Sequence, residues 1–311
     1  MRILLLGADG FLGRHAATAL RSLPGATVLT AGRRPDHDLR LDLATAQAGP
    51  LGEELAAHAP DAVVNFAGAV AGSAVKLAEV NARGPAVLCE ALERGAPKAR
   101  LVHIGSAGEY GVCAPGSSLA EDADARPVGV YGATKLAGSL AVAGSPLDAV
   151  VLRVFNPVGP GAPAGSLPGR LAAELRRAAP EGTGGVVRVG DLSAHRDFVD
   201  ARDIARAVAL AVAAEGPLPR LLNLASGQAR PVRAIADGLV TAAGFTGRID
   251  ESGAGSERSA AVSWQQADVS AAARALGWHP ETGLDETLRD LWLSTEPQAA
   301  DPSATEPPAT A

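Results

Sequence analysis

The sequence has little of what cross-links, metal sites and membrane spans require. Its 311 residues include two cysteines, Cys89 and Cys113, without a C-x-x-C spacing, so neither a disulfide framework nor a zinc site is expected. The six histidines are scattered without metal-ligand spacing, which predicts no metal. No apolar run approaches the roughly 18 residues that a membrane span needs. These absences predict a cytoplasmic protein without a membrane partner.

The chain also lacks runs of basic residues. Its net charge is -6, and 47% of its residues are hydrophobic against 20% charged, an ordinary globular balance. An acidic chain without a Lys/Arg cluster is not expected to bind nucleic acid or an anionic membrane. A chain of this length can form one large domain or two smaller ones. Small-molecule chemistry is the expected class of function.

Tyrosine and lysine are scarce as well. The chain has two tyrosines and three lysines, and one of each occurs at Tyr131 and Lys135. If a helix begins near Tyr131, positions i and i+4 lie on one face of it. A lysine ammonium there favours the phenolate of a tyrosine, whose ordinary pKa is about 10, and makes it a usable proton donor. The alternative for the pair alone is a half-buried tyrosine beside a solvated lysine.

Short apolar runs alternate with longer Ala/Leu-rich stretches of helical spacing. This alternation predicts a parallel sheet covered by helices on both faces. The expected strands are 3–6, 27–30, 62–66, 100–104, 149–154 and 221–224, and the expected helices include 12–20, 75–92, 131–143 and 204–213.

The first expected strand leads directly into a G-x-x-G-x-x-G turn. Glycines in such a turn let the backbone approach a pyrophosphate at a helix N-terminus, where free N-H groups and the helix dipole favour negative charge. The position of the turn after an N-terminal strand favours dinucleotide binding. The turn comprises Gly7, Gly10 and Gly13, with Phe11 and Leu12 between the last two.

The end of the second expected strand bears on the choice of cofactor. Binders of NAD usually place an acid there, on the ribose 2'-OH. Here the strand is followed by Arg33 and Arg34, with no acid before Asp36. Arginine forks suit a 2'-phosphate, which favours NADP, with NAD as the second choice. The alternative is a solvated loop in which Asp36 or Asp38 takes the ribose.

Further motifs occur in a fixed order along the chain. They are Leu41-Asp42-Leu43, Asn65-Phe66-Ala67-Gly68, Val80-Asn81-Ala82-Arg83-Gly84, the stretch 104–111, the Tyr131/Lys135 pair, the stretch 152–157, Arg196-Asp197-Phe198-Val199-Asp200 and Leu276-Gly277-Trp278-His279-Pro280. Over roughly residues 1–295 these motifs resemble the extended short-chain dehydrogenases/reductases of the NAD-dependent epimerase/dehydratase family. The resemblance implies an α/β fold: a Rossmann-type doubly wound parallel sheet with a smaller C-terminal α/β substrate lid.

The resemblance implies roles for individual residues. Ser106 matches the serine that hydrogen-bonds the reacting oxygen, Tyr131 matches the acid/base, and Lys135 matches the residue that holds the nicotinamide ribose. Asn81 resembles an asparagine that orders a water in the proton path, with a helix-interior residue satisfied by backbone as the alternative. Further cofactor contacts are implied for Asp42, Leu43, Phe66, Ala67, Gly68, Phe155 and Tyr131 itself.

On the substrate side the resemblance implies a nucleotide sugar. Asn156 follows the sixth expected strand, at the edge of the sheet where ligands bind, and resembles a substrate-contacting asparagine. Arg196 and Arg258 resemble arginines that hold the nucleotide diphosphate, a sensible charge match. For Arg258 the alternative is a surface residue in a Ser/Gly-rich loop.

The branch of the family decides the reaction. Dehydratases place an acid at one or both of the positions after the serine, whereas this chain has Ala107 and Gly108, with Glu109 displaced by one. The stretch 187–198 resembles GDP-4-keto-6-deoxymannose reductases more than other branches. The leading hypothesis is therefore NADPH-dependent reduction of a nucleotide-linked 4-keto-6-deoxyhexose. The alternatives are an NDP-sugar 4-epimerase, a ketoreductase of another natural-product ketone, and a non-catalytic dinucleotide-sensing module.

The same resemblance suggests a domain organisation. Residues 1–157 and about 198–225 are expected to form the dinucleotide-binding domain, and about 158–197 with 226–295 the substrate-binding domain. The Pro/Ala/Thr-rich tail 296–311 cannot build a core and is expected to be disordered. The helices 75–92 and 131–143 are where this family commonly pairs, so a homodimer is expected.

Overall fold

The computed structural model describes residues 1–178, 185–252 and 262–295. Its centre is a seven-stranded sheet whose strands all run parallel, in the order β11-β6-β5-β4-β1-β2-β3. Strands after β1 lie on both sides of it, so the sheet is doubly wound, and ligands bind at the carboxyl edge of such a switch point. The strands are β1 (Arg2–Leu6), β2 (Thr27–Gly32), β3 (Leu39–Arg40), β4 (Ala62–Asn65), β5 (Arg100–Ser106), β6 (Ala149–Val154) and β11 (Leu221–Leu224).

Helices cover both faces of this sheet, as the buried apolar strands require. One face packs against α1 (Phe11–Arg21), α7 (Ala201–Ala213) and α10 (Ser270–Leu276). The other packs against α2 (Ala48–His58), α4 (Gly84–Gly95) and α5 (Val130–Ala143). Two shorter helical segments lie near the site. The first is α3 (Ala74–Ala78), which continues through the π-helical turn Glu79–Arg83 into α4, and the second is the 3-10 turn Ala107–Glu109, which follows β5.

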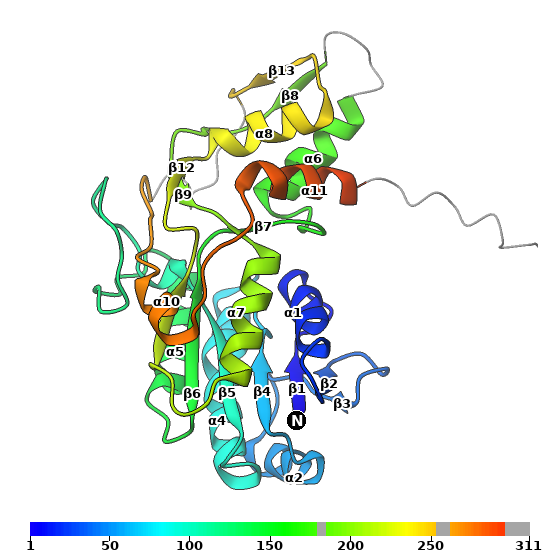
Figure 1. Ribbon diagram of the computed structural model, residues 1–311, viewed down its shortest axis with the longest axis vertical. Helices are drawn as coiled ribbons and strands as arrows, with labels where there is room; N and C mark the ends of the chain where they lie inside the picture. Colours follow the sequence, from blue (N-terminus) through cyan, green and yellow to red (C-terminus); the bar gives the residue numbers. More distant parts are fainter. Residues whose placement is uncertain (179–184, 253–261, 296–311) are drawn as a thin grey trace, which may run out of the picture.

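A smaller group of elements lies beyond the carboxyl edge of the sheet, in the upper part of Figure 1. Its three helices share a separate apolar cluster that includes Leu171, Leu239 and Leu288. The helices are α6 (Leu167–Ala178), α8 (Arg233–Ala243) and α11 (Leu284–Ser294), and the two-stranded pairs are β7 (Pro157–Val158) with β10 (Val199–Asp200), β9 (His195–Asp197) with β12 (Ala229–Pro231), and β8 (Val186–Arg188) with β13 (Arg248–Asp250).

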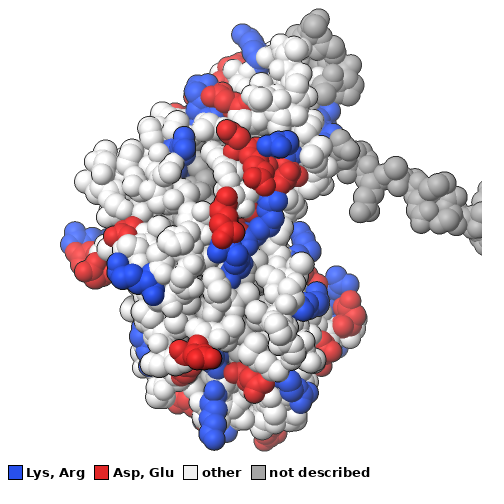
Figure 2. Space-filling view, viewed as in Figure 1, with Lys and Arg blue, Asp and Glu red and all other residues white. Residues whose placement is uncertain are grey.

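The C-terminal segment ties the smaller group to α7. Trp278 is fully buried and donates a hydrogen bond from Nε1 to the Asp203 carbonyl at 2.9 Å. Arg202 pairs with the carboxylates of Asp200 and Asp290 at 2.8 and 2.7 Å. Figure 2 shows acidic and basic side chains interspersed over this junction. The two groups of elements are therefore joined by specific contacts, and Leu276–Pro280 has a structural role.

The structure confirms the predicted fold class, with all six predicted strands present in the parallel sheet. The predicted helix 75–92 is wrong in one detail, because the π-helical turn at 79–83 interrupts it. None of the helices among residues 1–178, 185–252 and 262–295 is long and apolar enough to cross a membrane. The predicted disorder of 296–311 concerns residues outside the described part of the chain.

Candidate active site

The glycine turn is as tight as a pyrophosphate site requires. Gly7 has a φ of +79°, which favours glycine, and a Cβ on Gly13 would lie 2.0 Å from the Gly7 carbonyl oxygen. A Cβ on Gly7 would lie 2.9 Å from the backbone of Phe66 and Ala67. Gly10 precedes the first residue of α1, so the free N-H groups of that helix face the turn. These residues fit a dinucleotide phosphate at the N-terminus of α1.

The loop after β2 contains a small charged network. Arg34 hydrogen-bonds both carboxylate oxygens of Asp36, at 3.0 and 2.8 Å, and lies 3.8 Å from Asp9. His37 contacts Asp9 at 2.9 Å, and its ring fills the space that a Cβ on Gly32 would take. Arg33 is exposed. The structure thus brings both arginines to the end of β2, but acids already engage one of them.

Asp38 was considered as an alternative ligand of the cofactor ribose, but its carboxylate is hydrogen-bonded within the protein. Its carboxylate accepts hydrogen bonds from the backbone N-H and the hydroxyl of Thr30, at 2.7 and 3.0 Å. The backbone hydrogen bond is the main reason that the pKa of Asp38 lies below its usual value. Asp38 therefore fastens the loop to β2.

Ser106 and Tyr131 approach each other around a glycine. Ser106 ends β5, and Tyr131 is the second residue of α5. A Cβ on Gly108 would lie 3.4 Å from Ser106 Oγ and 3.5 Å from the Tyr131 ring, while a Cβ on Gly132 would lie 2.3 Å from the Gly108 carbonyl. Glycines at both positions therefore let α5 dock directly on the turn that follows Ser106.

Lys135 lies one helical turn further along α5 and is buried. Its Nζ donates to the Ile104 carbonyl at 2.5 Å. Burial lowers the pKa of Lys135 to about 8, and the charge of Glu109 acts in the opposite direction. The solvated lysine considered for the isolated pair is thus excluded. A buried ammonium near the tyrosine suits proton chemistry close to neutral pH.

Asn81 lies in the π-helical turn and is buried. Its side-chain amide bonds both backbone groups of Ala69, at 2.8 Å each, and donates to Thr134 Oγ1 at 3.3 Å. A Cβ on Gly138 would lie 2.1 Å from the Asn81 carbonyl oxygen. Asn81 therefore fixes the loop after β4 against α5. Its side-chain amide is hydrogen-bonded to backbone, as the alternative for this residue supposed, but to the backbone of the loop after β4 and not to that of its own helix.

The remaining predicted cofactor residues differ in their surroundings. Asp42 accepts from the Ala44 N-H at 3.0 Å, and Leu43 is buried beside Gly84. Phe155 is fully buried with its ring 6.0 Å from that of Tyr110. Phe66, Ala67 and Gly68 follow β4, where the first two form the wall against Gly7.

On the substrate side, Asn156 and Arg196 lie on adjoining segments. Asn156 Nδ2 donates to the Asp197 carbonyl at 2.9 Å and to Gln265 Oε1 at 3.3 Å. The Arg196 guanidinium donates to the carbonyls of His195 and Val262, and no carboxylate of the described residues pairs with it. A partly buried cation held only by carbonyls can accept an anionic ligand. Arg258 lies outside the described residues.

Two residues near the site have contacts that the sequence did not predict. Gln265 is buried and donates to the Ala107 carbonyl at 3.0 Å, so it connects the turn after Ser106 to Asn156. Glu109 is fully buried and pairs with Arg153 at 2.7 Å. Glu109 was conspicuous in the sequence only by its offset from the dehydratase position, and no local signal singled out Gln265.

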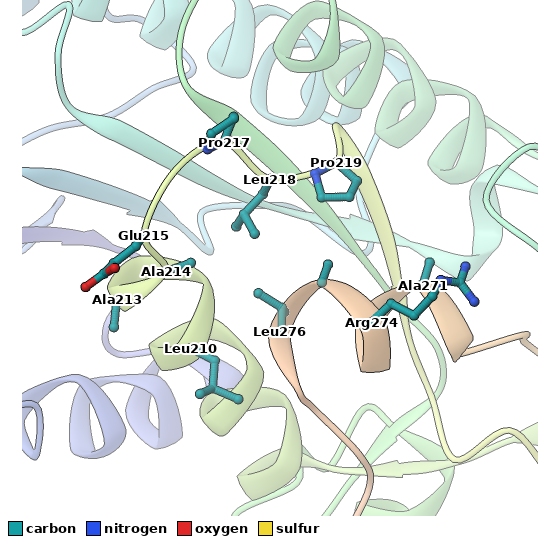
Figure 3. Close-up of a pocket in the computed structure, with 11 residues that line it drawn as sticks. Leu210, Ala213, Ala214, Glu215, Pro217, Leu218, Pro219, Ala271, Arg274 and Leu276 are labelled. Carbon is teal, nitrogen blue, oxygen red and sulfur yellow. The ribbon is translucent and has the colours of Figure 1, made fainter.

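Other features of the described residues do not compete as a site. No group of three or more His, Cys, Asp or Glu residues there could hold a metal ion. A cavity of about 540 Å³ lies between the end of α7, the start of β11 and α10, and Figure 3 shows Leu210, Leu218 and Arg274 around it. This cavity is near the amino end of β11, whereas Ser106 is the last residue of β5 and Asn156 follows the carboxyl end of β6.

A doubly wound sheet, a glycine turn and a Ser/Tyr/Lys group at its carboxyl edge define the class of extended short-chain dehydrogenases/reductases. The chain belongs to the family described as NAD dependent epimerase/dehydratase, which matches residues 3–225. The family, the fold and the enzyme class predicted from the sequence are thereby confirmed.

Individual relatives cover nearly the whole chain. dTDP-6-deoxy-L-talose 4-dehydrogenase (NAD(P)(+)) from Kitasatospora kifunensis is 36% identical, over 96% of this chain and 97% of its own. GDP-6-deoxy-D-mannose reductase from Pseudomonas aeruginosa is 27% identical, over 93% and 95%. The structure of MoeE5 in complex with UDP-glucuronic acid and NAD has a TM-score of 0.81 and 28% identity, over 95% of this chain and 99% of its own.

Proposed function

We propose that this protein reduces a nucleotide-linked 4-keto-6-deoxyhexose to the corresponding 4-hydroxy sugar, with NADPH as the preferred cofactor and NADH as the second choice. The relative that dehydrogenates dTDP-6-deoxy-L-talose at C4 catalyses, in reverse, a reduction of this kind. The relative named GDP-6-deoxy-D-mannose reductase supports the same class of substrate.

The observation that carries the proposal is the arrangement of acids around Ser106. The two positions after it are Ala107 and Gly108, which have no acid to offer, and the next residue, Glu109, is fully buried in an ion pair with Arg153. A carboxylate with no exposed surface cannot reach a sugar to protonate a leaving hydroxyl. Among the described residues, Ser106, Tyr131 and Lys135 therefore suit the reduction of a carbonyl. Neither of the two positions after Ser106, nor Glu109, offers an acid that could protonate the leaving hydroxyl of an elimination.

In the proposed reaction the chain positions and protonates the ketone. Ser106 Oγ donates a hydrogen bond to the sugar carbonyl, and Tyr131 gives its phenolic proton to the oxygen as negative charge develops there. The Lys135 ammonium stabilises the negative charge left on the tyrosine oxygen. A nicotinamide cofactor, when bound, would supply the hydride. Gly7, Gly10, Gly13 and the N-terminus of α1 would hold its pyrophosphate.

Arg196 would bind the substrate's diphosphate, because it is a partly buried cation without a carboxylate partner among the described residues. Asn156, held between Asp197 and Gln265, would contact the sugar. Arg258 is proposed as a second diphosphate ligand on the basis of its spacing in the sequence. Arg33 and Arg34 would hold the 2'-phosphate, in which case Arg34 exchanges Asp36 for the phosphate.

The second candidate function is an NDP-sugar 4-epimerase. It is favoured by the pairing of Arg34 with Asp36 and Asp9, which opposes phosphate binding at that position. It is also favoured by dTDP-L-rhamnose 4-epimerase from Burkholderia thailandensis, 32% identical over 58% of this chain and 50% of its own. An epimerase regenerates its cofactor in each turnover, whereas a reductase consumes one NADPH per sugar.

The discriminating experiment follows NADPH and NADH absorbance while purified protein acts on dTDP- and GDP-linked 4-keto-6-deoxyhexoses. We expect stoichiometric oxidation of NADPH and a product with a C4 hydroxyl. Interconversion of UDP- or GDP-hexoses with tightly bound NAD and no net oxidation would replace the proposal with the epimerase. Reduction of an unrelated ketone with no effect of Arg196→Ala would indicate a different ketone substrate.

Three further expectations belong to the proposal. We infer a cytoplasmic location from the cysteine usage. We also infer a homodimer that pairs through the helical segments 75–92 and 131–143, where the exposed Val75 and Leu140 offer apolar surface. The division into a dinucleotide-binding domain (1–157 and about 198–225) and a substrate-binding domain (about 158–197 and 226–295) is supported by the separate apolar clusters, with one exception: α10 and Trp278 pack with the cluster of the central sheet. Light scattering of the purified protein tests the dimer.

A further inference from the structure

Glu109 is a fully buried carboxylate three residues after Ser106. Its Oε1 accepts hydrogen bonds from the Ser106 backbone N-H at 2.7 Å and from Ser139 Oγ at 2.8 Å, and its Oε2 accepts from Arg153 Nε at 2.7 Å. The three donors lie on β5, α5 and β6. One carboxylate therefore connects the strand that ends at Ser106, the helix of Tyr131 and Lys135, and the next strand of the sheet.

The space for this carboxylate depends on a glycine. A Cβ on Gly105 would lie 2.8 Å from Glu109 Oε1, so any side chain at position 105 would displace the acid. Ser139 lies four residues after Lys135, on the same face of α5. The hydrogen bond from Ser139 to Glu109 thus fixes the rotation of the helix whose Lys135 enters the site.

Glu109 also acts on Lys135 through its charge. Tyr131 lies one turn before Lys135 on α5. Glu109, in the turn after β5, and His103, in β5, interact with Lys135 through its charge. His103 is fully buried, and burial together with the charge of Lys135 holds its pKa well below the usual value, so its ring is neutral. Arg153 is paired with Glu109. Burial lowers the pKa of Lys135 and the charge of Glu109 opposes that effect.

We propose that Glu109 is a positioning residue of the reaction: it fastens the Ser106 turn to α5 and places a negative charge near the buried Lys135. This inference rests on the proposed function, because it takes Ser106, Tyr131 and Lys135 as the reacting group. Glu109 itself touches neither substrate nor cofactor. Its effect reaches the reaction through the geometry of Ser106 and the charge of Lys135.

The scarcity of lysine makes a direct test practical. Protein labelled with ¹³C-lysine gives signals from Lys76, Lys98 and Lys135 alone, and Lys135→Arg identifies the third. In Glu109→Gln, which keeps the shape and removes the charge, we expect the titration midpoint of Lys135 to fall below the wild-type value, because the charge that opposes the effect of burial is lost. The pH at which kcat/KM declines on the alkaline side should move down together with this midpoint. Loss of the ordered turn should lower kcat about 10- to 100-fold with little change in KM.

The matched control is Asp203→Asn. Asp203 is also a buried carboxylate, and it accepts hydrogen bonds from Arg206 and from the backbone of Glu281 and Thr282, away from Lys135. This variant should lose stability and leave the Lys135 midpoint unchanged. A purely structural role for Glu109 predicts that both variants behave alike, which would overturn the inference.

The remaining outcomes separate this inference from the proposed function. If folded Glu109→Gln keeps the wild-type Lys135 midpoint, Glu109 does not set that charge, whatever the substrate. If Glu109→Gln does not fold, Glu109→Asp keeps the charge but shortens the reach, and unchanged kcat in that variant overturns the positioning role. If the wild type reduces no keto sugar while the midpoint shifts as expected, the proposed function fails and the role of Glu109 in the Lys135 charge stands.

Discussion

Gly138 is the point of closest approach between α5 and the π-helical turn, so its replacement by alanine should disturb the proposed reaction without touching a reacting group. A Cβ at this position would lie 2.1 Å from the Asn81 carbonyl oxygen and 3.1 Å from Pro85 Cγ. Ordinary carbon-oxygen contact requires about 1 Å more, and a packed interior yields by moving a whole element. Gly138→Ala should therefore push α5 outward and carry Tyr131 and Lys135 with it.

Two magnitudes follow from this displacement. Overpacking of this kind costs about 1–3 kcal/mol of unfolding free energy, against which alanine in a helix returns about 0.5–1 kcal/mol. A displacement of about 1 Å at the reacting group costs on the order of 100-fold in kcat. The assay is NADPH oxidation with saturating keto sugar, accompanied by urea unfolding of the same samples.

The matched control is Gly49→Ala in α2. A Cβ on Gly49 would have no heavy atom within 4 Å, so the variant should be neutral or gain stability and keep full activity. If Gly138→Ala retains kcat within about twofold while Gly49→Ala behaves as expected, α5 does not need its close contact with Asn81, and the reasoning from helix position to rate is refuted.

Three further changes test other parts of the site and the fold. Tyr131→Phe should lower kcat about 10²- to 10⁴-fold with an unchanged Kd for NADPH by fluorescence titration, and retention of most turnover would contradict the acid role. Arg33→Gln with Arg34→Gln should weaken NADPH about 10-fold or more and leave NADH nearly unaffected, because each charge-assisted bond to a phosphate contributes about 1.5–3 kcal/mol; equal effects on both cofactors would remove the argument for NADPH. Trp278→Ala should cost about 3–5 kcal/mol by urea unfolding, since this fully buried ring joins the C-terminal segment to α7; a cost below about 1 kcal/mol would contradict that role.

Much of the fold was predictable because its strands are continuous apolar runs. Strands buried on both faces leave this pattern in the sequence, as in β1, β4 and β6. Strand β3 and the short pairs beyond the sheet were not predicted, because elements of two or three residues show no periodicity. The π-helical turn at 79–83 was also missed, since one extra residue per turn hardly alters a helical apolar pattern over so short a stretch.

The motifs located Ser106, Tyr131 and Lys135 because their spacing is local. The contacts of Glu109 and Gln265 depend on distant residues: Arg153 follows Glu109 by 44 positions, and Gln265 lies 158 positions after Ala107. Only the topology brings such pairs together, so no spacing in the chain predicts them. Asp36 stands two residues after Arg34, and that pairing was within reach of the sequence.

The contacts of Glu109 with distant residues show what a shift of one position along the chain does to an acid near Ser106. A Cβ at position 108 would lie 3.4 Å from Ser106 Oγ and 3.5 Å from the Tyr131 ring, so an acid two residues after Ser106 would lie beside these groups, whereas Ala107 is buried in an apolar cluster. The capping turn Ala107–Glu109 directs the acid three residues on toward the sheet, where Ser106 N-H, Ser139 and Arg153 bind it. Moving one carboxylate from position 108 to position 109 thus exchanges a group beside Ser106 and Tyr131 for a buried anchor of the Ser106 turn. Under the proposed function, the offset of Glu109 therefore has two consequences: no acid lies at position 107 or 108, and the Ser106 turn is fastened to the sheet and to α5.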